Sequence, residues 1–363
     1  MIILGESRSG QRFTLLQCFA TQRSGSIDRS QADGTYFAHW LLVGEHFGEY
    51  SDLLFDRVSF GISNLEEWHD AKPFDFQLDH KEGVTSVTYS KPNSVTILED
   101  EQFIATLEFT YRPSAMCVAQ TSATIEHAAR INLRNSSSLP LYNYSETSAT
   151  SFFEYVQRIE SFIEFAIGTK VFPYDLRAYS SKFPESSDSQ YSRPIEIYRV
   201  LQVPSNTEPI HFHKMLFTWK RIQDDPQKYF QAWASKLPLI GMPVWLYLGS
   251  FRELLYEDQR FMELAQALEG YHRYRFPEKS KKTSKHERKL EEILEGCPEV
   301  HQKWLTTKLA YSHEPSLRSR LKELFKVQKD IVTWFTGSWT ALSEKKHETD
   351  IYLKRLSHHA AVA

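Results

Sequence analysis

The feature that most constrains the fold is a change in hydrophobic period near residue 225. Before it, short runs alternate apolar and polar residues, as in 55–63 (FDRVSFGIS), 84–89 (VTSVTY) and 103–111 (FIATLEFTY). Such alternation is typical of antiparallel strands with one buried face. After it, apolar residues recur at the 3.6-residue helical period. The sequence therefore predicts an α+β chain, with an antiparallel β-rich domain over 1–222 and an all-α helical bundle over 223–363.

One helix is expected inside the β-rich domain. Apolar residues recur at helical spacing between residues 151 and 167, and Gly168 follows as a stop signal. These apolar positions are Phe152, Val156, Ile159, Ile163 and Ala166. Strand-like segments return at 195–201 (IEIYRVL) and 211–219 (HFHKMLFTW), so this helix is predicted to be embedded in the sheet domain.

Composition narrows the class of protein. The 363 residues carry a formal net charge of −3, so only a local patch could bind a polyanion. Three scattered cysteines without a CxxC pair argue against a disulfide framework or a zinc site and fit a reducing compartment. The sequence starts without a basic-then-apolar leader, and its longest apolar stretch is interrupted by prolines. We therefore expect a cytoplasmic protein with no membrane segment and no cofactor.

Two clusters could carry chemistry. His211 and His213 would share one face of the expected strand, but without an obvious third ligand we interpret them as ordinary strand residues and expect no metal site. The segment 279–289 (KSKKTSKHERK) holds five lysines and one arginine. It is either a phosphate-binding segment or a solvated loop between two helices. Its candidate RNA-binding residues are Lys281, Lys282, Lys285 and Arg288.

Several stretches together resemble the ApeA-like family of bacterial defence proteins. The N-terminal half resembles the ApeA N-terminal domain in RFTLLQCF, YFAHWLLVGEHF and VSFGISNLEEWHD. The C-terminal half resembles its HEPN domain in RFMELAQALEGYHR (260–273) and SLRSRLKELF (316–325). The resemblance implies a HEPN helical bundle, usually a dimer, of the kind found in prokaryotic ribonucleases and toxins.

The catalytic signature of that family is an Arg, then four to six intervening residues, then a His, on a late helix, often written Arg-Asn-x-x-x-His. Here the corresponding stretch reads HETDIYLKRLSHHAAVA, with Asp350 where the family has its Arg. The nearest substitute is Arg355 with His358 or His359, with only two or three residues between them, which is shorter than the family's spacing. Arg355 and His359 are spaced i, i+4, so one helix face could present both. A truncated or divergent C-terminus is expected, and the alternative is that these are solvated tail residues.

Three functions stay open at this point. The first is an abortive-infection protein in which a HEPN-type, metal-independent RNA endonuclease is regulated by an N-terminal sensor of a phage-derived trigger. The second is a catalytically inactive member that binds RNA or protein. The third is a ligand-binding β-sandwich on a helical dimerisation module, which an aromatic-lined groove would favour. A homodimer through the helical half is expected from its many apolar residues, among them Trp304, Leu305, Phe325, Trp334 and Phe335.

Overall fold

The computed structural model divides the chain into two compact units, residues 1–235 and 236–363. It describes residues 1–25, 32–71, 74–79, 83–113, 125–136, 147–185, 192–200, 209–251 and 255–327. The division falls inside helix α3 (Pro226–Ile240). The expected limit after residue 222 precedes that helix and stays a prediction about where the domains divide.

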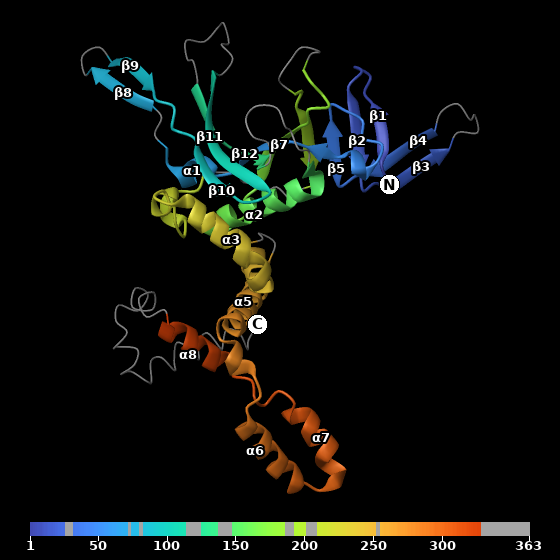
Figure 1. The fold of residues 1–363 in the computed structure, drawn as a ribbon, viewed down its shortest axis with the longest axis vertical. Coiled ribbons are helices and arrows are strands. Elements are labelled where there is room, and N and C mark those ends of the chain that lie inside the picture. The colour runs from blue at the N-terminus through green and yellow to red at the C-terminus, as the bar shows by residue number, and fades with distance from the viewer. Residues whose placement is uncertain are drawn as a thin grey trace. The chain divides into compact units, whose positions relative to one another are not determined.

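Unit 1 is built on a nine-stranded sheet in which every neighbouring pair is antiparallel (Figure 1). From edge to edge its strands are β1 (Ile3–Glu6), β2 (Arg12–Leu16), β5 (Trp40–Val43), β15 (Ile195–Arg199), β14 (Pro173–Tyr179), β7 (Arg57–Ile62), β12 (Ile125–Asn135), β11 (Phe103–Pro113) and β10 (Val95–Glu99). Three two-stranded sheets accompany it: β3 (Phe19–Gly25) with β4 (Ala32–Phe37), β6 (Leu54–Phe55) with β13 (Thr147–Ser148), and β8 (Phe74–Asp79) with β9 (Gly83–Tyr89). The expected antiparallel sheet is thereby confirmed.

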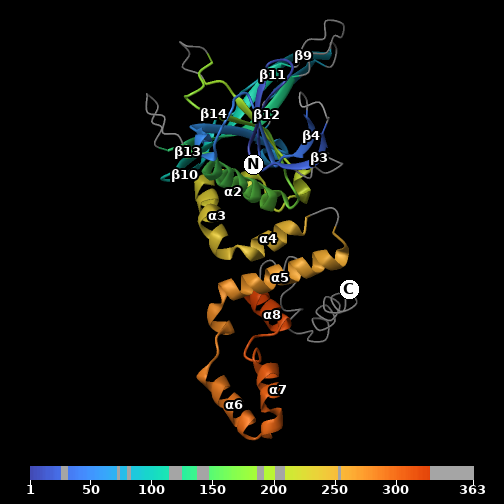
Figure 2. The same cartoon turned by 90° about the vertical axis from the view of Figure 1, so that its right-hand side faces the viewer.

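Helix α2 (Ala149–Ile167) covers one face of the large sheet, which we call the inner face (Figures 1 and 2). All five apolar positions predicted for this helix are buried, and they join the strands in one core. Phe152, for example, packs its ring against Phe55 and Phe103 of the strands. The embedded helix is therefore confirmed. In the described part of unit 1, α2 lies where a β-sandwich would place a second large sheet, so these residues do not form the β-sandwich of the third alternative.

The segment 211–219 is not a strand. His211 precedes a 3₁₀ turn, η2 (Phe212–Lys214), and a second turn follows as η3 (Trp219–Arg221). The backbone N–H groups of Leu216 and Phe217 donate to the Ala166 carbonyl at the end of α2, at 3.0 and 3.2 Å. Buried Met215 and Trp219 anchor the segment in the core. The apolar residues of this segment anchor a loop that packs against the C-terminal end of α2. Buried anchors alternate with exposed residues along this loop, and this alternation resembles that of a strand.

The described part of unit 2 is helical, as the sequence predicts. Its elements are α4 (Met242–Gly249), α5 (Glu257–Arg275), η4 (Pro277–Ser280), α6 (Ser284–Glu295), α7 (Glu299–Leu309) and α8 (Leu317–Val327). Helices α4 and α5 pack together, and α8 packs on α5 (Figure 2). The remaining short helices, both in unit 1, are η1 (Tyr50–Asp52) and α1 (Leu65–His69). In the described ranges no helix is long and apolar enough to cross a membrane.

Candidate functional site

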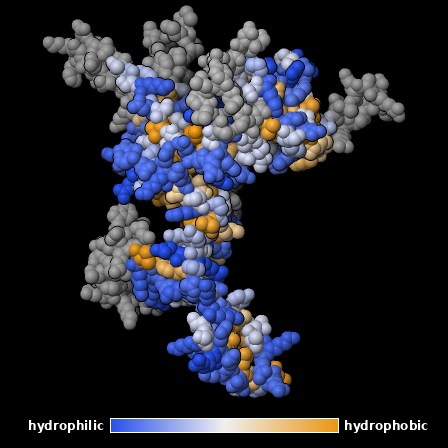
Figure 3. All heavy atoms as spheres, viewed as in Figure 1, coloured by the Kyte–Doolittle hydropathy of each residue, from blue (hydrophilic) through white to orange (hydrophobic). Residues whose placement is uncertain are grey.

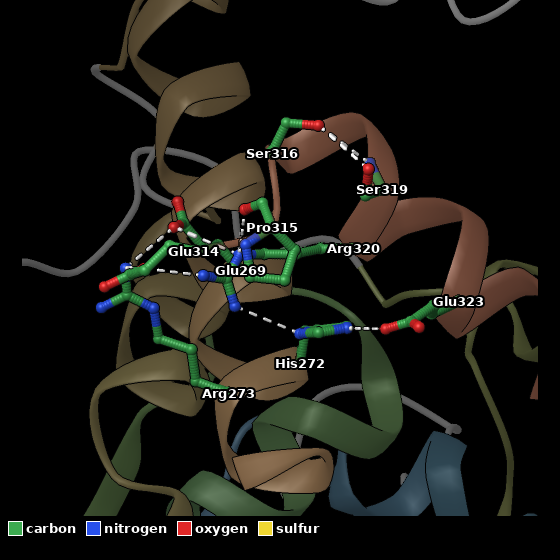
Figure 4. A network of polar contacts seen from close by, with 9 residues as sticks. All are labelled: Glu269, His272, Arg273, Glu314, Pro315, Ser316, Ser319, Arg320 and Glu323. Carbon is green, nitrogen blue, oxygen red and sulfur yellow. Dashed lines mark hydrogen bonds and ion pairs between the residues drawn. The ribbon is translucent and has the colours of Figure 1, made fainter. Parts of the chain in front are cut away.

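Among the described residues of unit 2, a polar cluster around two buried side chains joins α5 to α8 (Figure 4). Helix α5 contributes Glu269, His272 and Arg273, the residues before α8 contribute Glu314, and α8 contributes Arg320 and Glu323. We call this set the α5–α8 cluster. Its basic α5 members lie in the last turn of that helix, where positive charge suits the helix dipole.

Arg320 lies at the centre of the α5–α8 cluster and is completely buried. Its Nη2 donates to Glu314 at 2.7 Å, its Nε donates to the Pro315 carbonyl at 3.0 Å, and its Nη1 contacts Nδ1 of His272 at 3.2 Å. Glu269 adds a carboxylate 3.6 Å from Nε. The buried guanidinium is thus surrounded by acceptors, which offsets the cost of removing its charge from water.

The contacts of His272 define its tautomer. A guanidinium has only donors, so Arg320 donates to Nδ1 of His272, and the ring hydrogen must lie on Nε2. Nε2 then donates to Glu323 at 2.8 Å. His272 of α5 is fully buried, and it links the Arg320 guanidinium to the Glu323 carboxylate, both of which belong to α8. The ring therefore holds one turn of α8 against α5.

Glu323 closes the cluster at its outer side. Its second oxygen lies 3.1 Å from Nζ of Lys279 in η4. The hydrogen bond from His272, followed by the contact with Lys279, holds the pKa of Glu323 below its usual value. Both partners favour the carboxylate form, so the contacts of the cluster stabilise an ionised Glu323.

The α5–α8 cluster can hold helices together but cannot perform phosphate chemistry. Arg320 and His272 have no exposed surface, and every guanidinium nitrogen of Arg320 faces a partner. A phosphate would have to displace those partners to reach either side chain. The cluster is thus a structural tie between α5 and α8, and it brings together the two stretches, 260–273 and 316–325, that carry the HEPN resemblance.

Two protein-family models match the chain and identify its two domains. Residues 1–233 match the ApeA N-terminal domain 1, and residues 262–349 match the Apea-like HEPN domain. The chain belongs to the ApeA family. This pair of domains indicates an anti-phage defence protein with a nuclease-type HEPN domain. No curated protein and no solved structure matches the chain.

The predicted catalytic residues Arg355, His358 and His359 lie outside the described residues. They belong to the stretch 328–363, which directly follows α8 in the chain, and their roles stay predictions. The family match ends at residue 349, before all three of them. The α5–α8 cluster fixes the helix from which this stretch departs.

The four predicted RNA-binding residues lie partly on a loop and partly on helix α6, and their role stays a prediction. Lys281 and Lys282 lie between η4 and α6, whereas Lys285 and Arg288 lie on α6. All four are exposed, and Lys281 pairs with Glu278 at 2.7 Å. The loop interpretation is therefore wrong for the second half of the segment, where the Thr283 hydroxyl caps the start of α6.

His211 and His213 lie at a 3₁₀ turn and not on the strand that the sequence predicts. The rings of His211 and His213 stack with centroids 4.7 Å apart, and both residues are exposed. In the described ranges, no group of three or more His, Cys, Asp or Glu side chains could hold a metal ion.

Sequence reasoning missed the role of His272 and Arg320. They are 48 residues apart, and each looks like an ordinary residue of an amphipathic helix. One signal was available: His272 and Arg320 lie in the two stretches quoted for the HEPN resemblance, at positions that packing would bury.

Proposed function

We propose that the chain is an abortive-infection protein of the cytoplasm, with a HEPN region that cleaves RNA without a metal ion. The observation that supports this proposal is the succession of the two family matches, 1–233 and then 262–349. The N-terminal domain acts as the sensor of a phage-derived trigger, and the HEPN region acts as the effector, as a dimer.

The proposed reaction is transesterification within RNA. A base takes the proton of a 2′-OH, the 2′ oxygen attacks the adjacent phosphorus, and the bond to the 5′ oxygen breaks as that oxygen receives a proton. The products are a 2′,3′-cyclic phosphate and a 5′-OH. A cation stabilises the extra negative charge of the phosphorane. Histidine can serve as the base and the acid, and arginine can serve as the cation, so one Arg–His pair from each subunit would suffice.

In this chain we assign those roles to Arg355 with His359 or His358. The i, i+4 spacing of Arg355 and His359 would place both on one side of a helix. Arg320 and His272 are excluded from the reaction by their burial, and their task is to fix α8, which precedes the catalytic stretch.

The test is cleavage of single-stranded RNA by the full chain with EDTA present. Arg355→Ala and His359→Ala should each abolish cleavage, and the double variant should be no worse than either, because the two residues act as one unit. Lys354→Ala is the matched control, because it removes a neighbouring positive charge from the same stretch and should leave cleavage unchanged.

One observation favours the inactive-member alternative. Asp350 occupies the place of the family's Arg, and a carboxylate there would repel the scissile phosphate. RNA would then only bind, through the exposed cations Lys281, Lys282, Lys285 and Arg288, and this binding would weaken as salt rises. RNA that binds but stays intact with the wild-type chain, with or without the trigger, would support this alternative and contradict the nuclease.

A further inference from the structure

Two arginines lie directly opposite each other on the face of the large sheet that α2 does not cover, which we call the outer face. Arg57 begins β7, and Arg134 is its partner in the neighbouring strand β12. Val58 and Leu133, the adjoining residues of the two strands, are buried in the core on the inner face, and Asp56 on the other side of Arg57 is buried too. Side chains alternate between the faces of a sheet, so both arginines point outward. We call these two residues the arginine pair.

The arginine pair places two positive charges side by side. Residues directly opposite in an antiparallel ladder have Cα atoms about 4.5–5.5 Å apart, and like charges in such positions are destabilising. Both arginines are exposed. The Arg57 guanidinium lies over the Tyr179 ring of β14, with Cζ 3.9 Å from the ring centroid, so it leans away from β12 and Arg134. This cation–π contact positions Arg57 but does not neutralise its charge.

The nearest neighbours of the arginine pair on the outer face carry no negative charge. In the row of residues that are paired across the strands, Tyr179 flanks the pair on β14 and Ile104 flanks it on β11. The next row holds Arg177, Ser59 and Asn132. Within the described part of the chain, neither arginine of the pair forms an ion pair with a carboxylate. The repulsion between the two guanidiniums is therefore not offset by a neighbouring side chain.

The carboxylates of the neighbouring strands on this face are farther away or already bound. They are Glu99, Glu108, Asp175 and Glu196. Asp175 is bound by Arg130 and Arg177, and Glu196 lies opposite Arg177. Glu108 lies opposite Arg130, four residues along β12 from Arg134, which is about 13 Å. Glu99 shares the row of the pair, but strand β11 lies between them, a separation of about 10 Å. The arginine pair thus keeps its charge for an anion from outside these strands.

We propose that the arginine pair binds the phosphate group of a small phosphomonoester. Each guanidinium can donate two parallel hydrogen bonds to phosphate oxygens. A phosphomonoester carries a charge of about −1.5 to −2 at pH 7, so one such group neutralises both arginines. A carboxylate, or the phosphate of a diester, carries a single negative charge and leaves one arginine unneutralised. The Asn132 amide, one row away, can donate a further hydrogen bond. This site gives the N-terminal domain a ligand of its own, and its test needs no nuclease activity.

The experiment measures the binding of methyl phosphate to the full chain by a phosphorus NMR titration. Arg57→Gln and Arg134→Gln should each weaken binding by about tenfold, because each removes one charge-assisted contact with the dianion. Dimethyl phosphate, the corresponding diester, should also bind about tenfold more weakly than methyl phosphate. Arg8→Gln is the matched control, because it removes an exposed arginine of the turn between β1 and β2, at the edge of the sheet, and should leave binding unchanged.

Thermal unfolding separates a binding site from a structural contact. Without ligand, Arg134→Gln should melt at or above the temperature of the wild type, because it removes the repulsion within the pair. Excess methyl phosphate should raise the melting temperature of the wild type, since a ligand that binds only the folded state stabilises it. It should raise that of Arg134→Gln much less.

Four results would overturn the proposal. Equal losses in Arg134→Gln and Arg8→Gln would show attraction to positive charge in general instead of a site. Equal binding of methyl phosphate and dimethyl phosphate would show that the pair does not select a dianion. A lower melting temperature of ligand-free Arg134→Gln would show that Arg134 stabilises the sheet itself. A single-stranded oligonucleotide without a terminal phosphate that binds through both arginines, and more tightly than methyl phosphate, would assign the pair to a nucleic-acid backbone.

Discussion

At the scale of single residues, the HEPN region depends on a charge that water cannot reach. Arg320 is completely buried, and its donors contact Glu314, the Pro315 carbonyl and His272. Removing one partner of a buried charged pair leaves the other unpaired, which typically costs about 3–5 kcal/mol. The burial that makes Arg320 useless for catalysis thus makes it important for stability.

We expect Arg320→Ala and His272→Ala each to lower the free energy of unfolding by about 3 kcal/mol. Because the two side chains contact each other, the double variant should lose clearly less than the sum of the two. Denaturant unfolding of the four proteins measures this, and hydrogen exchange at α5 and α8 localises it. Lys322→Ala, on the exposed side of α8, is the control and should stay within about 0.5 kcal/mol of wild type. Strictly additive losses would contradict the tie.

Glu323 should make the same tie sensitive to acid. Its folded-state pKa lies below the usual 4.5, so its carboxylate contributes stability that is fully present above pH 4.5 and is lost as the pH falls through the folded value. The stability difference between wild type and Glu323→Gln should therefore shrink as the pH is lowered from 7 to about 3. Glu291→Gln, an exposed change on α6, should show no such trend. A difference that stays constant over this range would contradict the assigned contacts of Glu323.

At the scale of elements, helix α2 is the piece that the sequence described best. Its apolar positions, its position within the sheet domain and its stop at Gly168 are as the periodicity predicts. Gly168 ends the helix in a left-handed conformation with φ of 79°, and its N–H donates to the Glu164 carbonyl. A Cβ there would meet only Leu216 at an ordinary 3.6 Å, so backbone strain alone opposes a side chain.

Gly168→Ala should therefore destabilise unit 1 by about 1 kcal/mol, the cost of a left-handed conformation for a residue with a Cβ. Gly168→Asn should cost less, because asparagine tolerates this conformation better. Thermal unfolding of the two variants measures the difference. An alanine variant as stable as the asparagine variant would show that the helix end can rearrange.

Other elements could not be predicted from the sequence, for identifiable reasons. The segment 211–219 has the alternation of a strand, but its N–H groups close α2 instead of joining a ladder, and a local pattern does not reveal that choice. The register between β14 and β7 shifts between Tyr174 and Arg177, where Asp175 is left-handed with φ of 49°. This bulge has no glycine, and a single aspartate, although it tolerates the conformation better than most residues, is too weak a signal to predict it. The α5–α8 cluster depends on contacts 48 residues apart, which periodicity cannot specify.

At the scale of the whole molecule, the hairpin of α6 and α7 has an unusual amount of exposed apolar surface (Figure 3). Neither helix has a buried residue among those described. Val300 is 82% exposed and Trp304 is 62% exposed, and their i, i+4 spacing places them on one side of α7. Ile293 of α6 adds a third exposed apolar side chain. Apolar surface of this kind usually marks an interface.

We predict that Val300 and Trp304 lie in the interface of a homodimer through the HEPN region. A second copy would bury both side chains by the self-complementary contact that two-fold symmetry allows. Trp304→Asp should therefore convert the protein from dimer to monomer in sedimentation at about 10 μM, a concentration that a stable interface withstands. Its fold should persist, because Trp304 is 62% exposed and so contributes little buried surface among the described residues. Phe19→Ser, which removes an exposed aromatic residue of unit 1, is the control and should leave the dimer intact.

A wild-type monomer at this concentration would contradict the dimer, and a Trp304→Asp dimer would place its interface elsewhere. If the catalytic pairs must face each other across the dimer, Trp304→Asp should also abolish RNA cleavage without touching Arg355 or His359.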